Sequence, residues 1–192
     1  MTAHGRRAYA SALVLLAAGG LALLFAFGLT WGTAQIPVIA GAGDTVREQA
    51  FSGRDLFPGA AMAGWVALAA VAGIVATRSW GRTVVAVVAG LAGLLTVVVS
   101  VGFALSPSRA IDATVAQLVG PGSNAVMAST PAWLVGALGG IVVLVAAGWT
   151  ATRGRGWPTL GARYERHPRG ERSVSPWDAQ DLGRDPTDDL VE

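Results

Sequence analysis

The 192-residue sequence contains no cysteine, no lysine and only two histidines, His4 and His167. Without cysteine there can be no disulfide, no thiolate metal site and no cysteine nucleophile. Both histidines lie in terminal segments, which excludes imidazole-based catalysis inside a membrane. Charged residues make up 14% of the chain, compared with roughly 25% in typical soluble domains. The arrangement of the hydrophobic residues, which make up 53% of the chain, is therefore the main evidence for the class of protein.

The hydrophobic residues are gathered in four long segments that contain no Asp, Glu, Arg or His. A helix needs roughly 20 apolar residues to cross the hydrocarbon of a bilayer. The segments that reach this length are 8–29, 57–76, 83–105 and 131–150. The sequence therefore predicts an all-α fold, an integral membrane four-helix bundle within residues 1–152. Residues 153–192 are predicted to form a largely irregular cytoplasmic tail.

The placement of arginine predicts how the chain crosses the membrane. With the N-terminus inside, eleven arginines lie on the cytoplasmic side and three, Arg47, Arg54 and Arg109, lie outside. Because cytoplasmic loops carry an excess of basic residues, an N-in/C-in orientation is predicted. The first apolar segment exceeds the roughly 7–15 residues of a signal-peptide core, so we expect a retained helix rather than a signal peptide. The predicted location is the plasma membrane, crossed several times, with both termini cytoplasmic.

Small residues four positions apart recur in these segments, and such pairs let helices approach closely. The pairs are Gly136 with Gly140, Ala60 with Gly64, and Ala69 with Gly73. We expect them to pack inside the bundle, with a face for a homo-oligomer as the alternative.

Three shorter patterns predict local structure. The sequence "SWGR" at 79–82 predicts a tight turn between the second and third spans. Residues 108–119 predict a short interfacial helix. Its apolar side consists of Ile111, Val115, Leu118 and Val119. The hydroxyls of Thr96 and Ser100, the main polar groups within a span, are expected to bond to carbonyls of the preceding turn.

The first predicted outer loop, "GAGDTVREQAFSGRDLFPG", contains a cluster of polar residues. They are Asp44, Arg47, Arg54 and Asp55. Two acids and two bases this close predict either an ion-paired, solvated cap or a site for a small polar ligand. The glycines of "GAGD" do not form a phosphate loop, since no GK[ST] follows. Trp65, within the second span, is assigned to packing or lipid contact, with ligand stacking as the alternative.

The predicted tail has a basic half and an acidic half. Residues 153–172 hold six arginines and two glutamates, whereas residues 178–192 hold six acids. The basic half, from Arg153 to Arg172, is predicted to contact anionic lipid headgroups. In "SPWD", Ser175 is placed to cap a short helix at 176–182 that begins with proline. A helix this short needs a surface on which to dock.

At this tail, and at "GRDLFPGAAMAGWVALAAVAG" (53–73), the chain resembles a known family. It is similar to the tryptophan-operon-associated membrane proteins of high-GC Gram-positive bacteria, which have four predicted spans and a W-D-A-x-D-x-G-x-D-P-T-like motif. Here the motif consists of Trp177, Asp178, Ala179, Asp181, Gly183, Asp185, Pro186 and Thr187. The resemblance covers most of the chain, including Trp31 and Gly32 after the first span. It implies an association with tryptophan biosynthesis and no assigned biochemical activity.

These patterns predict a non-enzymatic integral membrane protein, accessory to tryptophan biosynthesis, whose tail motif docks a cytosolic protein. Docking of the motif on the protein's own bundle is an equal alternative. No catalytic residue, cofactor or metal site is predicted, and the net charge of +2 is too small to suggest nucleic acid. The expected partners are the lipid bilayer, a cytosolic protein and a second copy of the chain. The alternative function is a small transporter, or a transporter subunit, for an aromatic amino acid or precursor.

Overall fold

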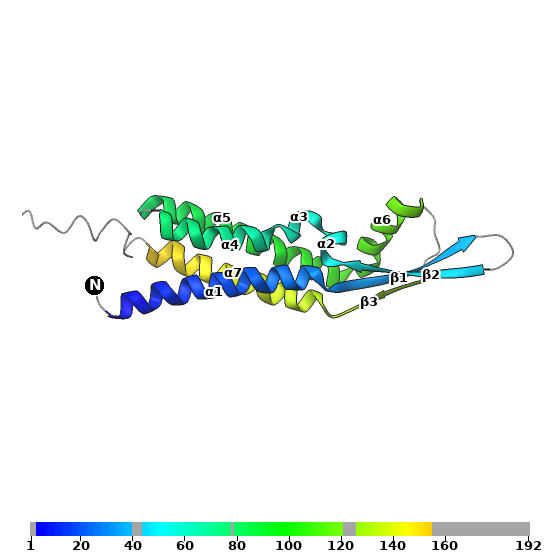
Figure 1. Ribbon diagram of the computed structural model, residues 1–192, viewed down its shortest axis with the longest axis horizontal. Helices are drawn as coiled ribbons and strands as arrows, with labels where there is room; N and C mark the ends of the chain where they lie inside the picture. Colours follow the sequence, from blue (N-terminus) through cyan, green and yellow to red (C-terminus); the bar gives the residue numbers. More distant parts are fainter. Residues whose placement is uncertain (1–2, 40–43, 78, 121–125, 155–192) are drawn as a thin grey trace, which may run out of the picture. The chain divides into compact units, whose positions relative to one another are not determined.

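The protein is described here from a computed structural model, which covers residues 3–39, 44–77, 79–120 and 126–154. Four long helices dominate it (Figure 1). They are α1 (Ala3–Gly28), α4 (Ala63–Ala76), α5 (Ser79–Leu105) and α7 (Trp133–Arg153). A short helix, α3 (Pro58–Ala61), precedes α4 and continues its path. The four resulting segments are long and apolar enough to cross a membrane.

The candidate spans fall where the sequence predicts them. They run over Arg7–Gly28, Pro58–Ala76, Trp80–Leu105 and Trp133–Arg153. The second span is not a single helix, because a turn at Met62 separates α3 from α4. The predicted turn at 79–82 is wrong, since these residues form the first turn of α5.

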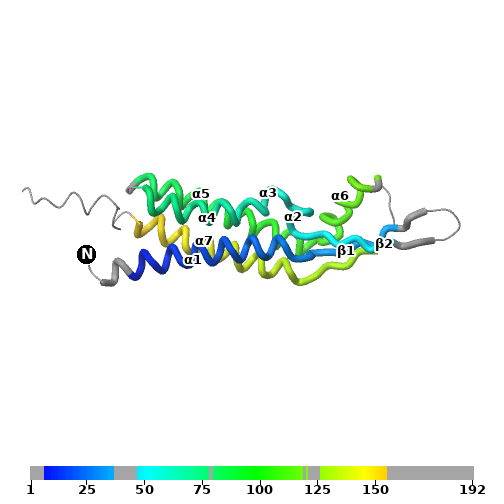
Figure 2. Tube along the Cα trace, viewed as in Figure 1, coloured from blue at the N-terminus to red at the C-terminus, as the bar shows by residue number. Residues whose placement is uncertain are grey.

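The four long helices are arranged as a ring of neighbours. α1 packs against α4 and α7, and α5 packs against the same two helices. Neighbouring helices are antiparallel, as the chain trace shows (Figure 2). α1 and α5 run toward a small β-sheet, and α4 and α7 run away from it. We refer to the end of the helices beside the sheet as the sheet end and to the opposite end, where Arg82 lies, as the Arg82 end.

Glycines bring α5 and α7 into backbone contact, as the pairs of small residues predict. A Cβ added to Gly140 would lie 2.5 Å from Thr96 Oγ1 and 2.9 Å from the carbonyl oxygen of Gly93. A Cβ added to Gly136 would lie 2.8 Å from Ser100 Oγ. Both glycines are buried, so this pair packs within the chain rather than on a free face.

The other small pairs pack less completely. A Cβ added to Gly64 would lie 2.9 Å from the Gly20 carbonyl oxygen of α1. Ala60, four residues earlier in α3, is also buried. Gly73 faces Val85 of α5. Ala69 is exposed, so the prediction of a packed position is wrong there, because this part of α4 turns Ala69 outward.

The all-α prediction is wrong at the sheet end, where the structure contains a three-stranded antiparallel sheet. Strands β1 (Thr30–Ile39) and β2 (Asp44–Ser52) form a hairpin, so the predicted solvated loop is largely β-structure. β3 (Val126–Ser129) pairs with the other edge of β1, giving the order β2-β1-β3. Pairing satisfies the backbone groups of β1 on both edges, which an irregular loop would leave to water.

Trp31 fills the junction between the helices and the sheet. Its side chain is completely buried, and its indole N–H donates a 2.9 Å hydrogen bond to the Ala26 carbonyl. The ring centroids of Phe27 and Phe103 lie 5.0 and 5.3 Å away. Gly53 is required here, because a Cβ on it would lie 2.8 Å from the indole ring.

A helix is present where the short interfacial helix is predicted, as α6 (Pro107–Val119). Ile111 and Val115 are buried on its inner side, whereas Leu118 is 64% exposed and does not share that side. Ile111 contacts the sheet at Gly32, where an added Cβ would lie 2.5 Å from Ile111 Cδ1. α6 therefore covers one part of the sheet.

Arg82 of α5 contacts the other three long helices at the end opposite the sheet. Its side chain is 1% exposed although it is charged. It donates hydrogen bonds to the carbonyls of Ile74 (Nε, 3.2 Å), Gly154 (Nη1, 2.7 Å) and Thr77 (Nη2, 3.4 Å). Its guanidinium also lies 5.8 Å from the centroid of the Tyr9 ring of α1. A cation bound to carbonyls at the C-terminal ends of α4 and α7 also opposes the negative ends of their dipoles.

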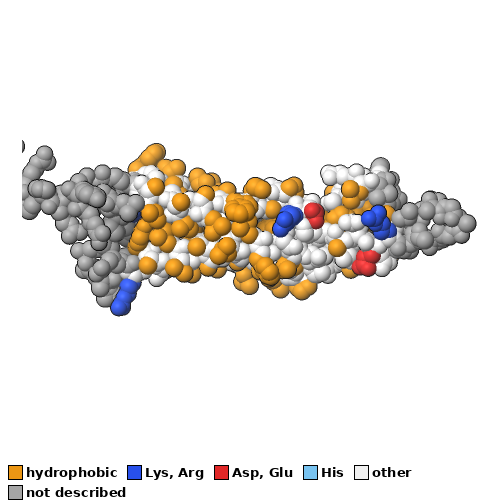
Figure 3. Space-filling view, in the orientation of Figure 1, with side chains coloured by type: hydrophobic (Ala, Val, Ile, Leu, Met, Phe, Trp, Pro, Cys, Tyr) orange, Lys and Arg blue, Asp and Glu red, His pale blue; other side chains and the backbone are white. Residues whose placement is uncertain are grey.

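The outer surface of the helices is apolar. On the face in Figure 3, hydrophobic side chains cover the helical part, and charged side chains lie toward its two ends. Exposed residues of α5 include Leu91 (61%) and Val98 (58%). An apolar surface this extensive on the described helices requires a covering of lipid or protein.

Candidate functional site: a groove between α1 and α3–α4

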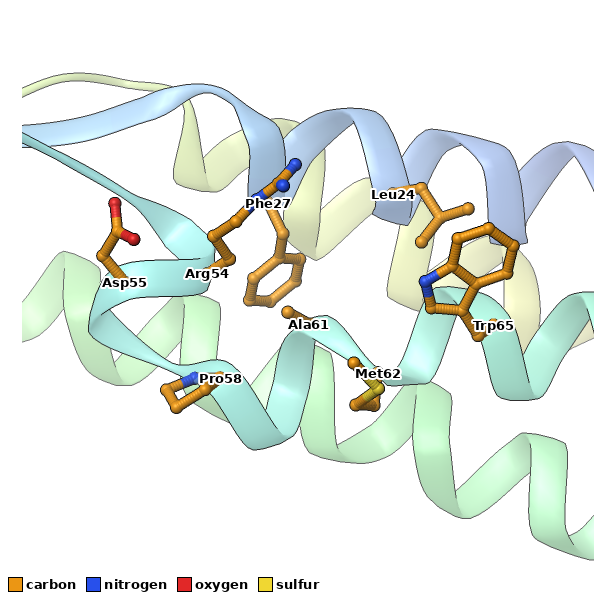
Figure 4. A pocket seen from close by; sticks show the side chains of 8 residues that line it. All are labelled: Leu24, Phe27, Arg54, Asp55, Pro58, Ala61, Met62 and Trp65. Atoms are coloured by element: carbon orange, nitrogen blue, oxygen red, sulfur yellow. The ribbon is translucent and has the colours of Figure 1, made fainter.

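A half-open groove of about 440 Å³ lies at the sheet end (Figure 4). α1 forms one wall, through Leu24 and Phe27. α3 and α4 form the other, and the short helix α2 (Gly53–Leu56) closes one end. The lining residues are Leu24, Phe27, Arg54, Asp55, Pro58, Ala61, Met62 and Trp65.

Local sequence explains why the groove opens where it does. Gly20 and Gly64 hold α1 and α4 in contact, with a Cβ on Gly64 only 2.7 Å from Leu24 Cγ. Nearer the sheet, Pro58 occupies the first turn of α3. A proline is tolerated there because a backbone N–H at that position would have no acceptor within the helix. The turn at Met62 then separates α3 from α4. The groove lies along this interrupted part of the second span.

Arg54 and Asp55 provide charge at the α2 end of the groove, and of the two only Asp55 has a hydrogen-bonding partner within the described part of the chain. The Asp55 carboxylate accepts hydrogen bonds from the Ser52 hydroxyl (2.6 Å) and the Ser52 backbone N–H (2.8 Å). These bonds, with the nearby Arg54 charge, hold the pKa of Asp55 below its ordinary value of 3.8. Among the described residues, none accepts a hydrogen bond from Arg54. In Figure 4 its guanidinium extends toward α1, away from the Asp55 carboxylate.

Trp65 lies at the opposite end of the groove from Arg54 (Figure 4). Its side chain is 60% exposed, and Met62 between them is 58% exposed. Trp65 therefore contacts the surroundings of the helices rather than the interior. An indole ring with one polar edge suits the border between hydrocarbon and headgroups.

The predicted polar cluster is divided between two elements. Arg54 and Asp55 lie in α2, whereas Arg47 lies on β2, opposite Ile36 of β1. The five residue steps along the strand from Arg47 to Ser52 correspond to about 17 Å at about 3.4 Å per residue. Arg47 is exposed and does not line the groove. Asp44 begins β2, and its side chain lies outside what the structure describes.

The predicted tail motif lies outside the described residues. This concerns Trp177, Asp178, Asp181, Gly183, Asp185, Pro186 and Thr187, and all of the basic half after Arg153. Arg153 itself is exposed at the end of α7, with its guanidinium 5.8 Å from the centroid of the Trp149 ring.

Sequence reasoning missed two features that had a signal in the sequence. Ser52 and Asp55 have the same S-x-x-D spacing that predicts a cap at Ser175 and Asp178. A signal for the hairpin was the segment 30–39, half of whose residues are β-branched, followed by the glycine-containing sequence "AGAG". The burial of Arg82 had no such signal, since it depends on where α4 and α7 end.

A second groove, of about 470 Å³, lies between α5 and α6. Like the first, it has one arginine, Arg109, beside an apolar wall that includes Val99, Phe103 and Leu105, but no acidic residue lines it. A guanidinium thus accompanies an apolar groove at two places near the sheet end.

Comparison with known proteins places the chain in a family. The model of the tryptophan-associated transmembrane proteins matches residues 13–187. No curated protein and no solved structure matches the chain. The family match covers well over half of the sequence and spans all four apolar segments. The chain therefore belongs to the family of tryptophan-associated transmembrane proteins.

Proposed function

We propose that this is a non-enzymatic protein of the plasma membrane that assists tryptophan biosynthesis by docking a soluble protein on its C-terminal motif. One observation carries the proposal: the family match continues from the spans to residue 187, well beyond the end of α7 at Arg153. The match ends at the last residue of the motif that begins at Trp177. The family therefore shares the tail through this motif as well as the helices, which supports a role for it.

A pull-down from crosslinked native membranes tests the docking role. Wild type is compared with Trp177→Ala and Asp185→Ala, and Leu190→Ala, three residues beyond the family match, is the matched control. We expect wild type and Leu190→Ala to recover an enzyme of tryptophan biosynthesis, and the two motif variants to lose it. Equal recovery with all four proteins would exclude docking through this motif.

The proposed orientation has both termini in the cytoplasm, which would place the sheet outside. The distribution of arginine supports this even after Arg82, which is buried, is omitted, since ten cytoplasmic arginines then face three outside. Because the chain has no cysteine, single cysteines can report the sidedness directly.

Ala50→Cys and Thr152→Cys are suitable positions, since both residues are exposed, one at each end. A membrane-impermeant maleimide should label Ala50→Cys in intact cells. It should label Thr152→Cys only after permeabilisation. The reverse pattern would overturn the orientation without affecting the docking test.

Transport of an aromatic solute has less support than docking. Gly93 and Gly140 bring the backbones of α5 and α7 together, which leaves no space for a solute between these helices. The segments 8–28, 58–76, 83–105 and 133–152 also contain no ionisable side chain of the kind that marks ion or proton pathways, apart from the phenol of Tyr9 near one end. This favours an accessory role over transport by a single copy.

A further inference from the structure

The groove between α1 and α3–α4 is polar at one end and apolar along its length. Arg54 lies at the polar end, while Leu24, Met62 and Trp65 line the apolar part (Figure 4). The seven helical steps from Pro58 to Trp65 correspond to about 10 Å of helix. This is about a third of the 30 Å hydrocarbon thickness of a bilayer. The groove therefore has the polarity and depth of the outermost part of one leaflet.

The charge of Arg54 is available to a ligand. Its guanidinium is exposed and lies over the end of α1, with Nη2 3.2 Å from a Cβ built on Gly28. Asp55, the next residue in the sequence, is bound by two donors of Ser52. An arginine guanidinium offers five N–H donors and binds phosphate oxygens in a bidentate manner.

The surroundings of the groove indicate which phosphate it meets. Its apolar residues belong to two membrane-spanning segments, so the groove is open to lipid rather than to bulk water along most of its length. A free phosphate ion would leave Met62 and Trp65 uncovered. A phospholipid covers them with an acyl chain while its phosphate reaches Arg54.

We propose that this groove binds an anionic phospholipid, with the phosphate on Arg54 and one acyl chain along Leu24, Met62 and Trp65. An anionic headgroup is preferred over a zwitterionic one, because a choline group would add a second cation beside the guanidinium. A basic side chain near a membrane surface contributes about 1 kcal/mol toward anionic lipid, which corresponds to about a fivefold preference. The proposal holds whichever leaflet contains the sheet end.

Native mass spectrometry of the full-length protein, released from an equal mixture of phosphatidylglycerol and phosphatidylcholine, tests the headgroup. We expect wild type to retain about five times more phosphatidylglycerol, and Arg54→Gln to retain both equally. Arg47→Gln is the matched control, an exposed arginine of the same end that lies outside the groove. Arg54→Lys keeps the charge and should keep most of the preference. If Arg54→Gln and Arg47→Gln retained phosphatidylglycerol and phosphatidylcholine in the same ratio, the proposal would be overturned.

Fluorescence quenching tests the position of the acyl chain. Phosphatidylglycerol with brominated chains should quench the wild type more than brominated phosphatidylcholine does. Trp65→Phe should remove that difference, although the other six tryptophans remain. In Arg54→Gln the two lipids should quench equally. If wild type and Trp65→Phe show the same difference, the chain does not lie in the groove and the proposal fails, whatever the headgroup preference.

Discussion

Replacing Arg82 by methionine should destabilise the helices at the end opposite the sheet. Methionine has a similar length but no donor, so the carbonyls of Ile74 and Gly154 lose their hydrogen bonds from the guanidinium. Hydrogen bonds to a charged group contribute about 1.5–3 kcal/mol each. The third bond, to Thr77 at 3.4 Å, is too long to add much. Methionine also removes the cost of burying a charge, which offsets part of the two lost bonds, so we expect a net loss of about 3 kcal/mol.

Thermal unfolding in detergent micelles, followed by tryptophan fluorescence, measures this loss. For a chain of this size, 1 kcal/mol shifts Tm by about 2–4 °C, so Arg82→Met should lower Tm by about 9 °C. Arg82→Lys keeps the charge but cannot reach three carbonyls, so its Tm should lie between those of wild type and Arg82→Met. Arg153→Met is the matched control, because Arg153 is exposed at the same end and its contact with Trp149 is worth under about 1 kcal/mol. Equal Tm values for Arg82→Met and Arg153→Met would refute the role of the buried arginine.

Three further predictions test the packing and the cap. Gly140→Ala should cost about 1–3 kcal/mol, because its Cβ meets backbone as well as side chains. Gly148→Ala, in open space on the same helix, should be neutral or slightly stabilising, and thermal unfolding compares the two variants. Trp31→Phe should cost about 1–3 kcal/mol, since it removes the indole hydrogen bond and leaves a gap in the core, and an unchanged Tm would contradict the buried position. Asp55→Ala should cost about 0.5–1 kcal/mol at pH 7. The folded pKa of Asp55 is lowered, so its contribution is fully present above pH 3.8 and is lost as pH falls through the folded pKa. A Tm difference from wild type that did not shrink as the pH was lowered below 3.8 would disprove this origin.

The helices were predictable from sequence because length and apolarity are local properties. A run of some twenty apolar residues identifies a span wherever its neighbours pack. The predicted and observed spans therefore agree closely for α1, α5 and α7. The break at Met62 was not predictable in this way, because the residues on both sides of it are apolar and small.

The sheet and the buried arginine depend on contacts between distant parts of the chain. β3 pairs with β1 across more than ninety residues, so no short pattern around Val126 identifies its partner. Arg82 lies 72 residues from Gly154, and its burial requires α4 and α7 to end at the same level. From sequence alone, Arg82 belongs with the loop arginines that orient the chain.

Ser100 shows the same limit within a helix. Its hydroxyl was expected to bond to the preceding turn, as that of Thr96 does to the Gly93 carbonyl at 2.8 Å. Instead, Ser100 Oγ is buried and has no hydrogen-bond partner among the described residues. The close approach of Gly136 from α7 surrounds this hydroxyl with packed atoms, which the sequence of α5 does not reveal.

The buried polar groups of the described helices are largely occupied by contacts within the protein. Thr150, like Thr96, donates to a carbonyl of its own helix. The Arg82 guanidinium donates to helix-end carbonyls, and the unpartnered Ser100 hydroxyl has Gly136 packed against it. In the middle of the described bundle, a polar solute would therefore find the Ser100 hydroxyl, and only after separating α5 from α7; the other buried donor without a partner among the described residues, the Trp149 indole N–H, lies near the C-terminal end of α7. The guanidinium of Arg54, by contrast, has no hydrogen-bond partner among the described residues and is reached without moving any helix, so we expect recognition at the ends of the molecule. If the protein in liposomes carried an indole-containing solute, and Ser100→Ala slowed it, the interior would have to open and this reasoning would fail.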